Sequence, residues 1–319
     1  MRHGVTENIK TITALAAVIL LLPACAPRDG LDAESAEYGE KPVVSEPEAE
    51  PEEEPVPEED IAHSEEAPSD SRETVTFEGK SYTLAFSDEF DFWDGGKWAR
   101  CPEIERQDAG GAWRDSCSAV EDGNLVITCD VAEDGTPVSG GVRSTGDYEQ
   151  TFGLYHIRFR MDKADGLWYA FWLLSDRMED AAAGNGAADG AELDIIELVP
   201  HTKELEMSVH WDGYGEDLKS YFEVADKSVI GADFYDNYHE LWYLWNREGY
   251  RLYLDGTDED SLLFDFPGET CGDGTCAVPC DLIISAEYGT WGGKIRTSQM
   301  PAHFCVDYVR VYTESDGGQ

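Results

Sequence analysis

The amino-acid sequence predicts an all-β fold, a two-sheet sandwich of the jelly-roll type. Short runs in which apolar and polar residues alternate recur along the chain, and this period of two is typical of half-buried strands. Turn signals such as Asp122-Gly123-Asn124 and Asp255-Gly256 separate the runs, and no long amphipathic helical pattern is present. We expect strands at Leu125–Thr128, Tyr155–Met161, Leu241–Trp245, Arg251–Leu254, Leu282–Ser285 and Val306–Tyr312.

Residues 1–24 have the composition of an export signal. Arg2 and Lys10 precede an apolar stretch that is short for a membrane span. Leu22-Pro23-Ala24-Cys25 then resembles a bacterial lipobox, in which the cysteine is lipidated and becomes the mature N-terminus. We therefore expect an exported bacterial lipoprotein with its lipid on Cys25. The alternative is ordinary signal peptidase cleavage near the same place, which would release a soluble protein.

Residues 25–72 are expected to be a disordered linker between the lipidated Cys25 and a folded domain at 73–319. From residue 26 to residue 72, seventeen Asp or Glu stand against three Lys or Arg, with many prolines. Such a segment buries little apolar surface and is extended by self-repulsion. It would hold the domain outside the cell membrane, with the lipid anchor as the only membrane contact.

The net charge of the chain is −44 at pH 7, and the domain that follows the linker is itself acidic. A surface this negative repels polyanions. Nucleic acid, sulfated galactans and polyuronates are therefore poor candidates as partners, with no nucleic-acid partner expected, and a neutral polysaccharide is favoured as the substrate.

Three carboxylates stand in the otherwise apolar run ELDIIELV. In a regular strand Glu192 and Asp194 share one face, and Glu197 points to the other. A β-bulge at Ile195-Ile196 would turn Glu197 back to join them, and bulges are common beside active sites. The alternative places Glu192 and Asp194 in water and buries Glu197, which is costly for a charge.

Two glutamates on one face, with an aspartate between them, suit glycoside hydrolysis with retention. That reaction needs a nucleophile and a proton donor whose carboxyl groups lie about 5–5.5 Å apart. The Ala/Gly-rich loop 181–191 leads into this strand and is expected to be a mobile surface loop or the lip of a cleft. Aromatic rings offer flat apolar faces to sugars. We expect the substrate to contact Trp168, Trp172, Trp211 and Trp291, with His210 and Arg143 as polar contacts.

Seven cysteines follow Cys25, so at least one is unpaired or bonds between chains. Cys271, Cys276 and Cys280 share a Gly-rich loop and could bridge locally. Cys129 and Cys305 lie in expected strands and are expected to be core residues.

These residues carry a resemblance to glycoside hydrolase family 16, in its laminarinase-like form with a bulged E-x-D-x-x-E. The match spans roughly residues 75–314, in the family's order. The matching segments are FSDEF (86–90), EDGNLVIT (121–128), SGGVRSTGDYEQTFGLYHIRFRM (139–161), GLWYAFWLL (166–174), ELDIIE (192–197), SVHWDGYG (208–215), LYLDG (252–256), GTWGG (289–293) and VDYVRVY (306–312).

The resemblance implies a concanavalin/lectin-like jelly roll with a concave substrate cleft. It implies Glu192 as nucleophile, Glu197 as general acid/base and Asp194 as the hydrogen-bond partner of the nucleophile. No cofactor is required for this chemistry. Family members often carry a structural calcium on the convex face, and Glu89 and Asp307 stand at the matching positions. The alternative for these two is a pair of plain surface carboxylates.

The sequence as a whole predicts a membrane-tethered endo-β-glycanase that hydrolyses a neutral β-glucan, laminarin-type β-1,3 or mixed β-1,3/1,4, through a covalent glycosyl-enzyme. One alternative is a β-galactan hydrolase or a transglycosylase of the same family. An alternative of another class is a lectin module that binds a glycan without turnover.

Overall fold

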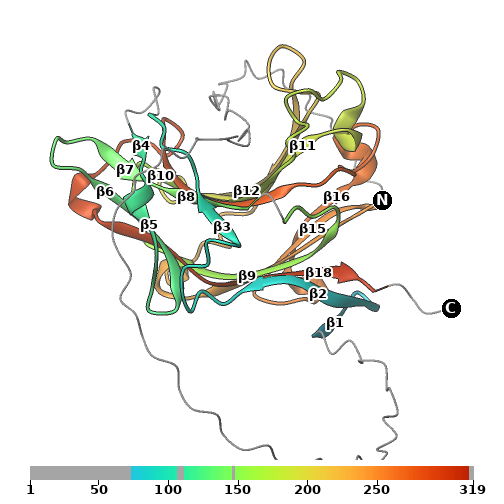
Figure 1. Cartoon of the computed structure of the whole chain (residues 1–319), viewed down its shortest axis with the longest axis horizontal. Coiled ribbons are helices and arrows are strands. Elements are labelled where there is room, and N and C mark those ends of the chain that lie inside the picture. Colours follow the sequence, from blue (N-terminus) through green and yellow to red (C-terminus); the bar gives the residue numbers. More distant parts are fainter. Residues whose placement is uncertain (1–72, 106–110, 146–147, 316–319) are drawn as a thin grey trace, which may run out of the picture. The chain divides into compact units, whose positions relative to one another are not determined.

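The computed structural model describes residues 73–105, 111–145 and 148–315. Within these ranges the chain forms two stacked β-sheets, and its helical elements are short 3₁₀ turns (Figure 1). No helix in this described part is long and apolar enough to cross a membrane. The predicted all-β, two-sheet architecture is confirmed. The 3₁₀ turns are η1 (Asp115–Cys117), η2 (Gly186–Ala188), η3 (Phe234–Asp236), η4 (Glu259–Ser261), η5 (Gly268–Cys271) and η6 (Thr297–Gln299).

The larger sheet has eleven strands and contains five of the six strands expected from the sequence. Its strands are β1 (Thr74–Phe77), β2 (Lys80–Asp88), β4 (Ala112–Trp113), β5 (Ser118–Glu121), β6 (Asn124–Val131), β7 (Pro137–Ser139), β9 (Gly153–Met161), β14 (His239–Asn246), β15 (Gly249–Leu254), β16 (Leu262–Pro267) and β18 (Ala302–Glu314). They run in the order β16-β15-β14-β9-β18-β6-β7-β4, with β2 also beside β18, β1 beside β2 and β5 beside β6.

The smaller sheet has seven strands, and its outer face, which points away from the larger sheet, is concave (Figure 1). Its strands are β3 (Trp98–Arg100), β8 (Gly141–Ser144), β10 (Leu167–Leu174), β11 (Ala191–Val199), β12 (Glu204–Trp211), β13 (Lys219–Val224) and β17 (Asp281–Tyr288). They run in the order β13-β12-β11-β10-β17-β8-β3. The carboxylate run of the sequence is β11, near the middle of this sheet.

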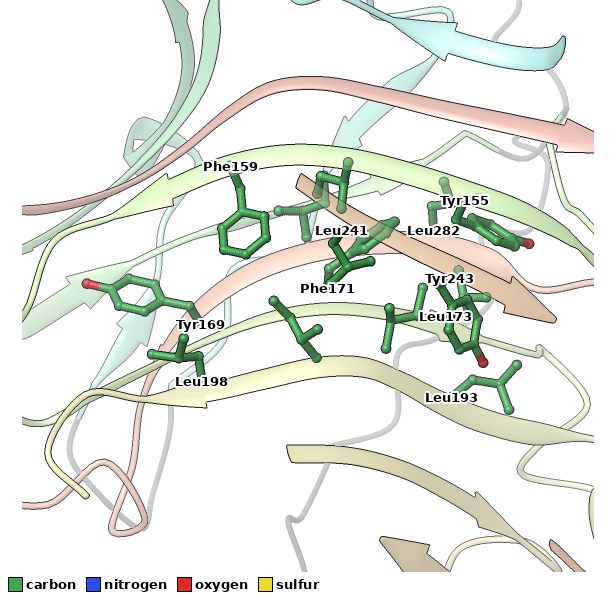
Figure 2. Close-up of a cluster of buried hydrophobic side chains, with 14 of the residues drawn as sticks. Tyr155, Phe159, Tyr169, Phe171, Leu173, Leu193, Leu198, Leu241, Tyr243 and Leu282 are labelled. Atoms are coloured by element: carbon green, nitrogen blue, oxygen red, sulfur yellow. The ribbon is translucent and has the colours of Figure 1, made fainter. Parts of the chain in front are cut away.

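The main core lies between the two sheets. Figure 2 shows side chains of both sheets meeting there, with Tyr155, Phe159 and Tyr243 from β9 and β14 facing Phe171 and Leu193 from β10 and β11. Full burial of one such side chain stabilises the fold by about 1.5–3 kcal/mol. Because side chains of a strand alternate, this packing fixes which residues of each strand remain on the outer face.

The pairing of β11 is irregular at the position where the sequence predicts a bulge. The register with β12 shifts between Asp194 and Glu197, and the partners of β10 skip from Ile196 to Asp194. Ile195 and Ile196 are 0% and 1% exposed, and both belong to the core between the sheets. Two consecutive residues therefore face inward, and Glu197 returns to the face that carries Asp194.

All seven cysteines of the described part are buried. Cys129 is a core residue between the sheets, as expected, and Cys305 is buried on β18. The Sγ atoms of Cys276 and Cys280 lie 3.9 Å apart, so the Gly-rich loop does bring two of its three thiols together.

The loop before β11 is anchored more firmly than its composition suggests. Ala187 is fully buried, and the backbone N–H of Gly186 donates to the Asp212 side chain at 3.1 Å. A Cβ atom on Gly186 would lie 2.3 Å from the backbone nitrogen of Asp273. The expectation of a mobile surface loop is wrong at these positions, because a glycine lets two backbones pack directly against each other.

We expect Gly186→Ala to destabilise the fold more than Gly184→Ala. Both glycines have positive φ, +62° and +89°, and an alanine there costs roughly 1–2 kcal/mol in backbone strain. A Cβ at Gly184 meets nothing within 4 Å, so only Gly186→Ala adds a clash. Urea unfolding of both variants measures the difference. Equal losses of unfolding free energy would mean that the backbone of the Asp273 loop moves aside freely.

Candidate active site

Three carboxylates of β11 project from the outer, concave side of the smaller sheet, which we call the carboxylate face. Leu193, Ile195 and Ile196 point into the core, and Glu192, Asp194 and Glu197 therefore point outward. Asp194 is buried, whereas the two glutamates are partly exposed. The structure thus brings together the three side chains that the sequence singled out.

Asp194 is held by the neighbouring strand β12. The Ser208 hydroxyl donates to its Oδ2 at 2.6 Å, and His210 Nε2 lies 3.1 Å from the same oxygen. His210 Nδ1 in turn lies 2.5 Å from Ser220 Oγ on β13. Burial lowers the pKa of His210, but the hydrogen bond to Asp194 and the charges of Asp194 and Glu192 outweigh burial and raise that pKa to about 9. His210 is therefore a fixed cation beside Asp194 at neutral pH.

Glu192 accepts a hydrogen bond on Oε2 from the Tyr214 hydroxyl. Tyr214 lies just beyond β12, between Gly213 and Gly215, and both glycines have positive φ. Burial and the Asp194 charge raise the pKa of Glu192 to about 7, while His210 and the Tyr214 hydrogen bond oppose that rise. Tyr214, rather than Asp194, is the donor that the structure gives to the expected nucleophile.

The pKa of Glu197 is raised well above that of a free carboxyl group. Burial is the main cause, and the charges of Asp194 and Glu206 add to it. Glu206 is the cross-strand partner of Glu197 on β12, and burial raises its own pKa to about 7. The two glutamates therefore titrate as an interacting pair, and both hold a proton more firmly than a free carboxyl group does.

Two interacting carboxyl groups on one face suit the division of labour in a retaining glycosidase. One carboxylate must be free to attack while the other still holds a proton for the leaving group. Glu192, which accepts the Tyr214 hydrogen bond, fits the first role, and Glu197, whose pKa is raised by burial and by the charges of Asp194 and Glu206, fits the second.

The sequence from residue 105 to residue 308 matches the family model of glycosyl hydrolases family 16. The chain belongs to this family. It therefore contains a glycoside hydrolase domain, which acts on O-glycosyl bonds. The match includes β11 and all three of its carboxylates.

Two curated relatives share 28% identity with the chain. One is a keratan-sulfate endo-1,4-β-galactosidase of Sphingobacterium multivorum, aligned over 72% of this chain and 55% of that protein. The other is a β-glucanase of Rhodothermus marinus, aligned over 72% of this chain and 85% of that protein. The chain thus spans only about half the length of the first relative. Among solved structures, an endo-β-1,3-glucanase from Pyrococcus furiosus has the same fold, with a TM-score of 0.62, 21% identity, and coverage of 76% of this chain and 99% of that one.

Three of the four expected tryptophans lie at the carboxylate face of this family 16 domain. Trp168 and Trp172 alternate with the core residues of β10 and are nearly buried. Trp168 packs against Trp291, with ring centroids 5.9 Å apart. The Trp172 indole N–H donates to the Ser285 hydroxyl at 3.2 Å. The indole of Trp291 donates to the Glu204 carboxylate at 3.3 Å.

Two expected substrate contacts have other roles. Trp211 is 7% exposed and belongs to the core between the sheets, because it alternates with His210 on β12 and must point the other way. Arg143 donates through Nε to Asp281 at 2.7 Å and through a terminal nitrogen to Asp176 at 2.5 Å. The prediction for Trp211 is wrong, and Arg143 is an ion-pair partner within the protein.

Sequence reasoning missed four members of the site. Ser208 and Glu206 were detectable, because in ELEMSVHW they alternate with apolar residues in step with His210. Glu287 lies on β17 opposite Trp168 and contributes to the raised pKa of Glu197. Tyr214 follows the strand in a turn, and no periodicity could place its hydroxyl on Glu192.

The residues at the expected calcium site do not fit a calcium ion. Glu89 is held by Arg310 through two hydrogen bonds of 2.9 and 2.7 Å, and Asp307 accepts from Arg158 at 2.5 Å. Calcium needs several oxygen ligands at one point. Each of these carboxylates instead neutralises a different arginine, so the reading of two plain surface carboxylates describes them better.

We expect Tyr214→Phe to move the acidic limb of the activity profile toward higher pH. In the wild type the hydrogen bond from Tyr214 lowers the pKa of Glu192. The variant lacks this bond, so the pKa of Glu192 should rise by about one unit, as expected for a bond to a charged acceptor. Because Glu192 must be ionised to attack, the acidic limb of the activity profile follows the pKa of Glu192. The pH dependence of kcat/KM tests this.

Tyr221→Phe is the matched control for that measurement. The Tyr221 hydroxyl donates to Glu223 at 2.7 Å, so this variant also removes a tyrosine–glutamate hydrogen bond. Tyr221 packs against Phe266, on the side of β13 away from the carboxylate face. An unmoved acidic limb in Tyr214→Phe would show that its hydroxyl does not control Glu192.

Proposed function

We propose that this chain is an endo-acting β-glycanase that hydrolyses a neutral β-glucan, laminarin-type β-1,3 or mixed β-1,3/1,4, with retention of configuration. The observation that carries the proposal is the placement of Glu192 and Glu197 on one face of β11, where burial and neighbouring carboxylates raise the pKa of both. The carboxylate face lies on the concave side of the sheet, where a polysaccharide can bind at a point away from its ends.

In the first step the Glu192 carboxylate attacks the anomeric carbon, the glycosidic C–O bond breaks, and Glu197 gives its proton to the departing oxygen. In the second step Glu197, now ionised, takes a proton from water, and the water oxygen displaces Glu192 from the anomeric carbon. Asp194, held in place by Ser208 and His210, lies between the two glutamates on the strand and orients the site around the cation-like sugar of the transition state.

The electrostatics of the site favour an unsulfated glycan. Four carboxylates act on Glu197 at the carboxylate face, Asp194, Glu206, Glu192 and Glu287, and the negative potential of this group repels sulfate groups. The β-glucanase of R. marinus supports a glucan substrate. The relative that is a keratan-sulfate endo-1,4-β-galactosidase supports a second candidate function, a β-galactan hydrolase that acts on an uncharged galactan. A transglycosylase would use the same covalent intermediate with a sugar in place of water.

We expect the first product of hydrolysis to have the β configuration of the substrate. Proton NMR on a panel of laminarin, mixed-linkage β-glucan and uncharged β-galactan, recorded early in the reaction, reports both the substrate and the anomer. Glu192→Gln and Glu197→Gln should each lose at least about a hundredfold in kcat and keep glycan binding, since general acid–base or nucleophilic groups contribute about 10²–10⁴-fold.

Glu223→Gln, on the same sheet but facing away from the site, is the control and should retain activity. An α anomer as the first product would refute Glu192 as the nucleophile. Binding of a glycan without turnover, with both glutamate variants equal to the wild type, would support the lectin alternative.

We infer that the domain is tethered outside the bacterial cell membrane by lipid on Cys25. Cys25 and the acidic segment to residue 72 lie outside the described residues. The support for the proposal is the lipobox-like Leu22-Pro23-Ala24-Cys25 at the end of the apolar stretch.

Cys25→Ser should abolish lipidation and leave the kcat of the domain unchanged, because an acidic linker separates the two. Detergent partitioning and the mass of the mature N-terminus measure this in cells that process bacterial lipoproteins. A wild-type protein that is cleaved elsewhere, without an acyl mass, would contradict the anchor and favour the released form.

A further inference from the structure

The hairpin of β12 and β13 exposes an unusual amount of apolar surface. Four large hydrophobic side chains of the described residues are exposed, and three of them come from this hairpin and its turn: Tyr214 at 38%, Phe222 at 44% and Val224 at 42%. The fourth, Phe92, lies near the opposite edge of the smaller sheet, in the loop before β3. Tyr214 is accounted for by its hydrogen bond to Glu192, but Phe222 and Val224 are not.

Phe222 lies on the carboxylate face. It is the cross-strand partner of Ser208, whose hydroxyl binds Asp194, and paired residues of neighbouring strands share a face. Ser220, two residues away, lies 2.5 Å from His210 and confirms that face. Tyr221, between them, packs against Phe266 on the core side.

Phe222 also lies in line with the catalytic residues. The register aligns Asp194 with Ser208 and Ser208 with Phe222, in a row perpendicular to the strands. The next row aligns Glu197, Glu206 and Val224 in the same way. Neighbouring strands are about 4.8 Å apart, which places Phe222 roughly 10 Å from Asp194 along the sheet, farther than one sugar ring.

Structural needs do not explain these side chains. An exposed apolar residue on an edge strand invites pairing with another chain, and proteins usually place charge or proline there. β13 is the outermost strand of its sheet and has Lys219 and Glu223, yet it turns a phenyl ring and an isopropyl group outward on the carboxylate face. The hydroxyl of Ser220 and the carboxylate of Glu206 adjoin this apolar patch, so it offers an apolar surface with polar acceptors at its edge.

We propose that Phe222, with Val224 beside it, forms a distal glycan-binding subsite that holds a sugar of the same chain whose glycosidic bond lies over Glu192 and Glu197. The apolar face of a pyranose would stack on the Phe222 ring, and its hydroxyls would donate to Glu206 and Ser220. This subsite rests on the proposed function, since its occupant is the polysaccharide that the carboxylates cleave. It makes the domain selective for long chains over short ones.

Phe222→Ala tests the subsite with a series of oligosaccharides of increasing length, prepared from each glycan of the panel. For oligosaccharides that reach β13, kcat/KM should fall about three- to tenfold, mostly through KM, because an aromatic contact of this kind contributes about 0.5–1.5 kcal/mol. For oligosaccharides too short to reach β13, kcat/KM should be unchanged. Phe222→Tyr keeps the flat ring and should behave as the wild type.

Glu223→Ala is the matched control, because Glu223 is the next residue of the strand and faces the other way. An equal loss at every oligosaccharide length would overturn the subsite, since it would place the effect at Ser208 and Asp194. Unchanged kinetics at every length would overturn it as well.

Calorimetry in the Glu192→Gln background separates this inference from the proposed function. If the wild type hydrolyses no glycan of the panel, but long oligosaccharides still bind and lose affinity with Phe222→Ala, the subsite stands and the hydrolytic proposal fails. If no glycan of the panel binds at all, both fail.

Discussion

The site depends on one local constraint, the inward packing of two consecutive isoleucines in β11. Ile195 and Ile196 both enter the core between the sheets, so the strand contains one residue more than its partners at this point. A regular strand would direct Glu197 into the core, where an ionised carboxylate is far too costly. The burial of two large apolar side chains, about 1.5–3 kcal/mol each, stabilises the irregularity that brings Glu197 beside Asp194 and Glu192.

The gathered negative charge then determines the chemistry. Burial and the charges of neighbouring carboxylates raise the pKa of Glu197, which has Asp194 on its own strand and Glu206 across from it. The cation His210 lies beside Asp194 and lowers the pKa of Glu192. His210, on the side of Glu192, and Glu206, opposite Glu197, therefore both favour Glu197 as the group that holds the proton.

The β12–β13 hairpin serves the site in three ways. It supplies the partners of Asp194 through Ser208 and His210, it carries the tyrosine that donates to Glu192, and its outer strand presents Phe222 in line with them. The loop before β11 fixes the hairpin from the other side, where the Asp212 carboxylate accepts from Gly186. Different residues of this one hairpin therefore serve the ionisation of the carboxylates and the binding of a long chain.

Local patterns in the sequence were sufficient to predict the two-sheet fold, the strands and the three carboxylates, because alternation with a period of two is a local property that burial enforces residue by residue. They also predicted the bulge, since only an extra residue keeps Glu197 out of the core. The residues that face these side chains from other strands became visible only in the folded protein. Trp211 and His210 are adjacent in the sequence, yet register places one in the core and the other on Asp194. The donor to Glu192, the charge of Glu206 opposite Glu197 and the arginine partners of Glu89 and Asp307 likewise follow from strand pairing and loop packing between residues far apart in the chain, which no local pattern encodes.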